Sequence, residues 1–295
     1  MKRQPTVLVT GANGQLGQSL QTLVLQNPSL PFRFVFLDKD RLNIANEQAV
    51  KDAFKTFNPE VLVNCAAYTQ VDKAEQEHER AFEINATGVG FLAKACAETN
   101  ALLLQISTDF VFDGKQNNPY NETAMTNPMN VYGQSKHMGE QLALLYHSQS
   151  IIIRTSWLYS PYCQNFVKTM LRLGRERKSL QVVYDQIGSP TYAPDLAQAI
   201  VQLALQRESI DTGKLYHYAN TGVASWYDLA VETFNLAGID CEVTPILTHQ
   251  YPTPAQRPAY SVLDTSKIRT ELGLHIPYWR DSLAKCVSLV ISNKG

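Results

Sequence analysis

A tyrosine and a lysine four residues apart are the side chains best suited to chemistry in this sequence. Tyr132 and Lys136 form a Y-x-x-x-K pair, and positions i and i+4 of a helix project from one face. A phenol can donate a proton to a ketone oxygen that gains negative charge as a hydride arrives at its carbon. We expect the ammonium of Lys136 to lower the pKa of Tyr132 below its ordinary value of about 10. A solvated helix with one half-buried aromatic residue would give the same pattern.

Hydroxyl and carboxyl side chains follow the apolar run 102–106, as Ser107-Thr108-Asp109. In an open α/β sheet, ligands bind at the carboxyl ends of the strands. The Thr108 hydroxyl can hydrogen-bond a substrate carbonyl there and polarise it. A plain cap of the strand end is the alternative, and Ser107 would serve for it as well as Thr108.

A glycine-rich turn lies between the first apolar run and a helical pattern. It reads Gly11-Ala12-Asn13-Gly14-Gln15-Leu16-Gly17, which is G-x-x-G-x-x-G. Glycines let a diphosphate come close to the backbone, and the free N–H groups of the following helix favour an anion. The turn therefore predicts a dinucleotide site, with a tight strand-to-helix turn of no further function as the alternative.

Charged residues after the second apolar run bear on the choice of dinucleotide. Asp38 can accept hydrogen bonds from the adenosine ribose, which favours NADH. Lys39 and Arg41 can pair with a 2′-phosphate, which favours NADPH, unless they belong to a solvated turn. We therefore expect both cofactors to be accepted. Small residues after the third run (64–69) leave room for the cofactor, although packing explains them equally well.

Strands alternating with helices must position these residues. Short apolar runs occupy 7–9, 34–37, 61–63, 102–106 and 151–153, with helical patterns at 15–25, 47–57 and 81–99 between them. This alternation predicts an α/β fold with a Rossmann-type doubly wound parallel sheet. Beyond 155, prolines and aromatic residues increase. We expect a dinucleotide-binding domain over 1–155, joined by a returning segment near 187–212, and a smaller C-terminal substrate-binding domain mainly over 156–295.

The composition excludes several classes of function. The 295 residues are 44% hydrophobic and 18% charged, with a net charge of -1 that disfavours nucleic-acid binding. The five cysteines are scattered without a C-x-x-C pair, which suits a reducing compartment and argues against a zinc site. No apolar stretch approaches the ~20 residues of a membrane span. We therefore expect a cytoplasmic protein with no membrane segment and no metal.

The motifs in combination resemble those of a known family. The glycine turn, Ser107-Thr108-Asp109 and the Tyr132–Lys136 pair look like the extended short-chain dehydrogenase/reductase superfamily. The likeness to the dTDP-4-dehydrorhamnose reductase family is closer and covers nearly the whole chain. It is carried by segments 71–75, 107–114, 130–133, 154–157, 185–191 and 251–258.

The resemblance implies an activity and a role for each residue. That family reduces the C4 keto group of dTDP-4-dehydro-6-deoxy-L-mannose to give dTDP-L-rhamnose with NADPH or NADH. By motif, Tyr132 donates the proton, Lys136 assists it and binds the cofactor, and Thr108 polarises the ketone. Thr108 and Asp109 contact the sugar, and Trp157 lies against its ring. The implied cofactor residues are Gly11, Asn13, Gly14, Gln15, Leu16, Gly17, Asp38, Asn43, Ile44, Ala67, Tyr68 and Thr69, besides Tyr132 and Lys136.

The sequence departs from the family pattern at two positions and leaves alternatives open. Asn43 stands where the family often has Asp, and Tyr68 where it often has His, so the nucleotide preference is open. Phe110 replaces the acid that a sugar 4,6-dehydratase would need. Another nucleotide-sugar reductase or epimerase remains an alternative, as does an NADP-binding regulatory subunit without activity. Some relatives form Mg-linked dimers; a homodimer stays open here, but no compact carboxylate cluster supports the metal.

Overall fold

Six parallel strands form the main sheet of the computed structural model, which describes residues 4–209 and 212–292. Their order across the sheet is β10-β5-β4-β3-β1-β2. The strands are β1 (Thr6–Thr10), β2 (Arg33–Leu37), β3 (Val61–Asn64), β4 (Leu102–Thr108), β5 (Ile151–Thr155) and β10 (Leu215–Tyr218). The expected parallel α/β sheet is confirmed.

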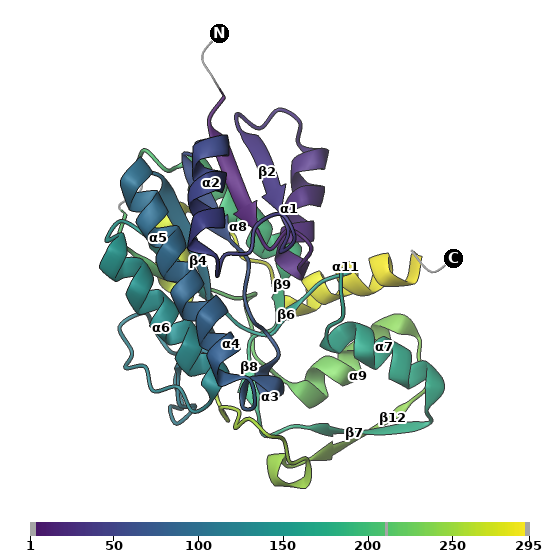
Figure 1. Cartoon of the computed structure of the whole chain (residues 1–295). Coiled ribbons are helices and arrows are strands. Elements are labelled where there is room, and N and C mark those ends of the chain that lie inside the picture. The colour runs from purple at the N-terminus through teal and green to yellow at the C-terminus, as the bar shows by residue number, and fades with distance from the viewer. Residues whose placement is uncertain (1–3, 210–211, 293–295) are drawn as a thin grey trace.

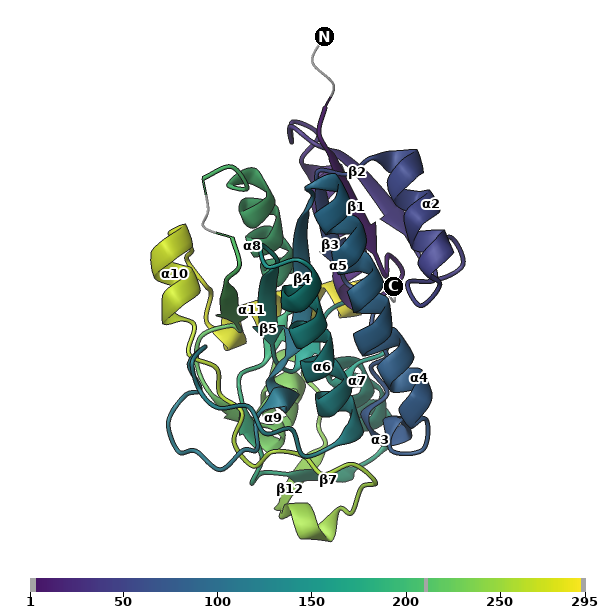
Figure 2. The same cartoon turned by 60° about the vertical axis from the view of Figure 1, so that its left-hand side comes forward.

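Helices cover both faces of this sheet (Figures 1 and 2). One face packs against α1 (Gln15–Gln26), α8 (Ala193–Leu205) and α10 (Ser266–Leu272). The other packs against α2 (Glu47–Phe57), α5 (Gly88–Thr99) and α6 (Val131–Tyr146). Successive residues of a strand point to opposite faces, so Val61 and Val63 join the first core while Leu62 joins the second. Continuous apolar runs are thus what a sheet covered on both faces requires.

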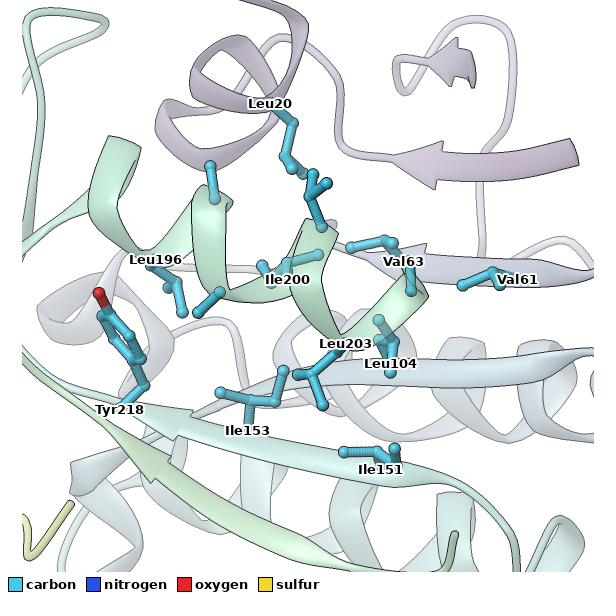
Figure 3. Packing of buried hydrophobic residues seen from close by; sticks show 14 of the residues in the cluster. Leu20, Val61, Val63, Leu104, Ile151, Ile153, Leu196, Ile200, Leu203 and Tyr218 are labelled. Atoms are coloured by element: carbon cyan, nitrogen blue, oxygen red, sulfur yellow. The ribbon is translucent and has the colours of Figure 1, made fainter. Parts of the chain in front are cut away.

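The first of these cores is dominated by α8, which comes from far along the chain (Figure 3). Leu196, Ile200 and Leu203 of α8 point toward the strands, where they meet Val63, Leu104, Ile151 and Ile153. The segment that returns to the sheet therefore includes α8 and continues through β10 and α10. The domain boundaries given by the sequence stay a prediction.

A smaller lobe lies beyond the carboxyl ends of the strands (Figure 1). It contains α7 (Phe166–Glu176), α9 (Trp226–Ala237) and the parallel pair β7 (Ser179–Val183) and β12 (Glu242–Ile246), with α11 (Trp279–Ser292) packed against α9. Two short strand pairs join the lobe to the rest of the chain. They are β6 (Leu158–Tyr159) with β9 (Thr191–Tyr192), and β8 (Ile187–Gly188) with β11 (Ala224–Ser225).

Short helical segments complete the fold around the site. They are α3 (Val71–Ala74), α4 (His78–Phe82), the π-helical turn η1 (Glu83–Thr87) and the 3₁₀ turns η2 (Asp109–Val111) and η3 (Thr248–Gln250). The π turn runs directly into α5. None of the helices in the described residues is long and apolar enough to cross a membrane.

Candidate active site

A cavity of about 770 Å³ opens at the carboxyl ends of the strands, between the sheet and the smaller lobe. Its wall includes Gly11 after β1, Cys65 after β3, Thr108 on β4 and Thr155 on β5, and Trp226 of the lobe closes it. The chain leaves β1 toward β2 on one side and continues with β3 on the other. Such a change of direction is where open α/β sheets bind their ligands.

Most residues singled out from the sequence meet in this cavity. Those that line it are Gly11, Asn13, Gly14, Gln15, Leu16, Asp38, Asn43, Ile44, Ala67, Thr69, Thr108, Asp109, Tyr132, Lys136 and Trp157. Gly17 and Tyr68 do not. Gly17 instead packs against the glycine turn, and a methyl group on it would lie 2.5 Å from the Gly11 carbonyl oxygen.

The Tyr68 side chain is not part of the cavity wall, so it does not provide the side-chain contact that the sequence suggested for it. Its hydroxyl donates a hydrogen bond to Glu77 at 2.9 Å, and its ring packs with Ala74 and Val131. Its backbone is fixed by Asn85, whose side chain bonds both the N–H and the carbonyl of Tyr68. The departure from the family's histidine therefore lies outside the cavity wall.

The glycine turn has the geometry of an anion cradle. Gly11 adopts a φ of 65°, and a methyl group on it would lie 2.6 Å from the Ala66 nitrogen. The Gly14 N–H donates to the Gly11 carbonyl at 3.0 Å, which closes the turn. Gly14 precedes α1 and offers no side chain to cap it, so N–H groups of the first turn stay available. These residues fit the diphosphate of a dinucleotide.

Asp38 lies at the far end of the same wall. It accepts hydrogen bonds from the Asn13 side chain at 3.0 Å and from the Arg41 N–H at 3.1 Å. Lys39 also lines the cavity, whereas the Arg41 guanidinium bonds the Phe36 carbonyl at 3.1 Å. Of the two cations considered for a 2′-phosphate, only Lys39 therefore faces the cofactor side.

Helix α6 carries the proton-donor candidate at its first turn. The Asn130 side chain caps the helix by accepting from the Gly133 N–H at 2.8 Å, and Glu75 accepts from the Val131 N–H at 2.8 Å. Desolvation raises the pKa of Tyr132 to about 12, and a hydrogen bond with Thr108 offsets only part of that rise. Tyr132 therefore stays protonated at neutral pH.

Lys136 lies one turn further along α6 and is 4% exposed. Its ammonium donates to the Ile106 carbonyl at 2.6 Å. Burial lowers its pKa to about 8, and the nearby Glu140 carboxylate opposes that change. The expected lowering of the Tyr132 pKa by Lys136 is not found, because desolvation of the phenol dominates and the ammonium is held on the β4 backbone.

Glu140 and Arg154 form a buried ion pair close to Lys136. Arg154 of β5 bonds both carboxylate oxygens of Glu140, at 2.8 and 2.7 Å, and both side chains are about 95% buried or more. Burial pushes the pKa of Glu140 upward, but the hydrogen bonds from Arg154 and His137 outweigh it and hold the pKa at about 2. The pair was not foreseen, although Tyr132, Lys136 and Glu140 share the helical i, i+4, i+8 spacing.

Three buried polar groups on the cavity wall have no hydrogen-bond partner in the described part of the chain. They are Ser107 Oγ, Asp109 Oδ2 and Thr155 Oγ1. Burial raises the pKa of Asp109 to about 6, and the neighbouring side chains of Ser261 and Thr108 offset part of that rise. Buried polar groups are normally hydrogen-bonded, so these three fit a polar ligand above β4 and β5. Thr155 was not among the residues predicted from the sequence.

An aromatic wall faces these groups from the smaller lobe. Trp157 and Trp226 stack with ring centroids 3.6 Å apart and planes 4° apart, and Phe166 lies 4.7 Å from Trp226. Trp157 holds a φ of 48°, a strained value for a residue with a side chain. Trp226 and Phe166 were missed, although Ser225-x-x-Asp228 and Asn165 before an apolar run signal the starts of their helices.

The tail segment 251–258 is bonded to α3 and to the start of α6. Arg257 pairs with Asp72 through two hydrogen bonds, at 3.0 and 2.8 Å, and the Ala255 N–H donates to the same carboxylate. The Asn130 side chain donates to the Gln256 carbonyl at 2.7 Å. This places Arg257 on the cavity wall. No group of three or more metal-ligating side chains occurs in residues 4–209 and 212–292.

Comparisons with a family model, with curated proteins and with solved structures all point to the same family. The model of the RmlD substrate binding domain matches residues 5–291. The chain is 42% identical over 286 residues to a dTDP-4-dehydrorhamnose reductase of Aggregatibacter actinomycetemcomitans, covering 94% of this chain and 96% of that protein. A crystal structure of the dTDP-4-dehydrorhamnose reductase of Clostridium acetobutylicum has a TM-score of 0.91 and 40% identity, over 97% and 99% of the chains. The Bacillus anthracis dTDP-4-dehydrorhamnose reductase in complex with NADP matches with a TM-score of 0.91 and 40% identity, over 96% and 99%.

Proposed function

This chain belongs to the dTDP-4-dehydrorhamnose reductase family, and from that premise we propose that it reduces the C4 keto group of dTDP-4-dehydro-6-deoxy-L-mannose. The product is dTDP-L-rhamnose, a precursor of cell-surface polysaccharide, and the reductant is NADPH or NADH. One observation carries the proposal. Tyr132 and Thr108 line the same cavity as the glycine cradle at the start of α1.

The residues divide the work of the reaction between them. A reduced nicotinamide, held by the glycine turn and Lys136, would supply a hydride to the ketone carbon. Thr108 donates a hydrogen bond to the C4 oxygen and polarises the ketone. Tyr132 transfers its proton to that oxygen as negative charge develops there. Its high pKa keeps the proton available across the neutral range, while the change of charge at the ketone oxygen drives the transfer.

Lys136 holds the cofactor from the inner face of α6. Its ammonium is anchored on the Ile106 carbonyl at the end of β4, and it remains largely protonated at neutral pH because its pKa is about 8. Glu140 and Arg154 keep a fixed charge pair beneath it. Asp109 Oδ2 and Thr155 Oγ1, which lack hydrogen-bond partners in the described residues, bond the sugar hydroxyls. Trp157 forms the wall beside the sugar ring.

Turnover of the keto sugar is the direct test. The substrate is made in situ by the enzymes that dehydrate and epimerise dTDP-glucose, and cofactor oxidation is followed at 340 nm. We expect oxidation of NADPH or NADH that depends on this protein, with a product that has the chromatographic and NMR properties of dTDP-L-rhamnose. Absence of oxidation with either cofactor, in a sample that binds NADPH, would contradict the reductase proposal. An epimerase would interconvert the sugars without net cofactor oxidation.

We also propose that the protein is cytoplasmic and that it forms a homodimer. All five cysteines are free, and Cys65, Cys96 and Cys286 have thiol pKa values raised by burial, which fits inert thiols in a reducing compartment. Cell fractionation tests the location. Light scattering of the purified protein, with and without Mg²⁺, tests whether a dimer forms and whether the metal promotes it.

A further inference from the structure

One face of the cofactor helix α1 is bonded along its length to the segment that leads into the smaller lobe. Gln15, Gln18 and Thr22 have the i, i+3, i+7 spacing of a single helix face; we call them the α1 polar stripe. The segment is 158–165, which runs from β6 to the start of α7 (Figure 1). The cavity wall includes residues of both.

Gln15 makes the densest of these connections. Its side-chain amide donates to the Leu158 carbonyl at 3.2 Å. Its amide oxygen accepts from Ser160 Oγ and from Asn165 Nδ2, each at 2.9 Å. The amide is thus committed to the segment at three points. The backbone of Gly14, Gln15 and Leu16 lines the cavity at the start of α1, where it would meet the diphosphate of a dinucleotide.

The other two residues of the stripe bind the same segment further along. Gln18 donates to the Cys163 sulfur at 3.2 Å, and Thr22 Oγ1 lies 2.7 Å from the Tyr162 hydroxyl. The Cys163 thiol in turn donates to the Asn13 carbonyl of the glycine turn at 3.2 Å. The segment is therefore fastened to the helix and to the turn that precedes it.

Asn165 passes these restraints to the smaller lobe. Its side-chain oxygen caps α7 by accepting from the Lys168 N–H at 3.1 Å, while its nitrogen donates to Gln15. Asn165 and the next residue, Phe166, also line the cavity. One side chain thus sets the start of α7 and contacts the first residue of the cofactor helix.

We propose that Gln15 is a positioning residue that couples the two ligands: dinucleotide at the start of α1 strengthens the contacts that hold segment 158–165 and thereby raises the affinity for the nucleotide-sugar diphosphate. A ligand that restrains the backbone of Gln15 restrains its amide, so the segment is held more firmly when the second ligand arrives. Coupling between two binding equilibria is reciprocal. This inference rests on the proposed function, because it takes a dTDP-sugar as the second ligand.

Calorimetric titration measures the coupling without turnover. The Kd of dTDP is determined for the protein alone and for the protein saturated with NADP⁺, and the Kd of NADP⁺ is determined with and without dTDP. We expect each ligand to tighten the other by the same factor, in the ~5–150-fold range typical of coupled sites. Amide hydrogen exchange of segment 158–165 should slow when NADP⁺ alone is added.

Two variants of glutamines on one helix separate coupling from simple damage to the cofactor site. Gln15→Met keeps the length of the side chain and removes its three hydrogen bonds, so the coupling factor should fall to about 1 and NADP⁺ should no longer slow exchange in the segment. Gln21 bonds the Ala12 carbonyl at 2.7 Å from another face of α1 and is not part of the stripe. Gln21→Met should change the Kd of NADP⁺ by the same factor with and without dTDP, which leaves the coupling intact.

Thr22→Val provides an independent check away from the cavity wall, and serves also if Gln15→Met does not fold. It removes the bond to Tyr162, so the coupling factor should fall part of the way toward 1. Tyr162→Phe should lower the coupling factor by the same amount, and the double variant should show no further loss. Two results would overturn the coupling but leave the proposed function standing. One is an equal dTDP affinity of the wild type with and without NADP⁺. The other is a coupling factor that is undiminished in both Gln15→Met and Thr22→Val. No dTDP binding in the presence of NADP⁺ would remove the proposed function and the inference with it.

Discussion

The start of α1 and the inner face of α6 line the same cavity, but the first presents backbone groups and the second presents buried side chains. The α1 end is made of backbone: glycines that admit no side chain and N–H groups that no side chain caps. The α6 face is made of side chains whose charges have been removed from water, with Lys136 and Glu140 both less than 5% exposed. Backbone amides do not titrate, whereas desolvated side chains do so at shifted pKa values.

This difference separates binding from chemistry. A backbone cradle holds a diphosphate at every physiological pH and tolerates changes in nearby side chains. The α6 face holds the proposed proton-transfer groups, whose pKa values depend on how much water is excluded around them. We therefore expect substitutions on α6 to change rates, pH profiles and stability, and those near α1 to change which cofactor is bound. The four predictions below test that division, from the largest expected effect to the smallest.

Removal of the Tyr132 hydroxyl should have the largest effect. Tyr132→Phe keeps the ring and its contact with Phe110, so folding and NADPH affinity should hardly change. Because a general acid typically contributes about 10²–10⁴-fold, kcat and kcat/KM should fall by that factor. Tyr146→Phe, at the exposed end of the same helix, is the matched control and should keep full activity. Near-wild-type turnover in Tyr132→Phe would move the proton donor elsewhere, with Asp109 next.

Loss of the buried ion pair should show mainly in stability. Glu140→Gln leaves the Arg154 charge buried without its partner, which should lower the free energy of unfolding by about 3–5 kcal/mol in urea titrations at pH 7. The pKa of Glu140 is lowered to about 2, so its stabilising charge is fully present above about 4.5 and is lost as pH falls toward 2. The difference between wild type and variant should therefore shrink in acid. Glu176→Gln, in an exposed pair with Arg172, should cost less than about 1 kcal/mol.

The pH profile distinguishes Lys136 from Tyr132 as the group that limits activity in alkali. With the pKa of Lys136 at about 8 and that of Tyr132 at about 12, the ammonium is lost first as pH rises. We expect kcat/KM to fall by about tenfold per pH unit above pH 8. Lys136→Arg carries a charge that does not titrate in this range, so any activity it retains should lack this limb. A limb unchanged in Lys136→Arg would assign it to another group.

The smallest effect should come from a substitution of Asp38, which lines the cavity near the start of α1. Asp38→Ala removes a ribose acceptor and relieves repulsion of a 2′-phosphate, so NADH should weaken more than NADPH. Because Asp38 already accepts from Asn13 and Arg41, one exchanged hydrogen bond worth about 1 kcal/mol should shift the ratio of the two KM values by about fivefold. Equal loss for both cofactors would show that Asp38 does not discriminate between them.

The same division between backbone and buried side chains explains which features of the fold and the site could be predicted from the sequence. The glycine turn, the apolar runs of the strands and the Tyr132–Lys136 spacing depend on residues close together in the chain, where sterics and helix periodicity already fix the outcome. The parallel sheet follows from those runs, since strands covered on both faces need apolar residues at successive positions. The lining of the cavity by the predicted residues is a consequence of that topology.

Only the tertiary structure decided which groups are desolvated and which distant segments meet. Tyr132 and Lys136 have pKa values set by burial, and the amount of burial comes from packing that no local pattern records. Tyr68 turns to Glu77 because η1 places Asn85 against its backbone. Arg257 reaches Asp72 across 185 positions of sequence, and Gln15 reaches Asn165 across 150. Such contacts arise from many weak packing choices made together, so residue types and spacing along the chain cannot specify them one at a time.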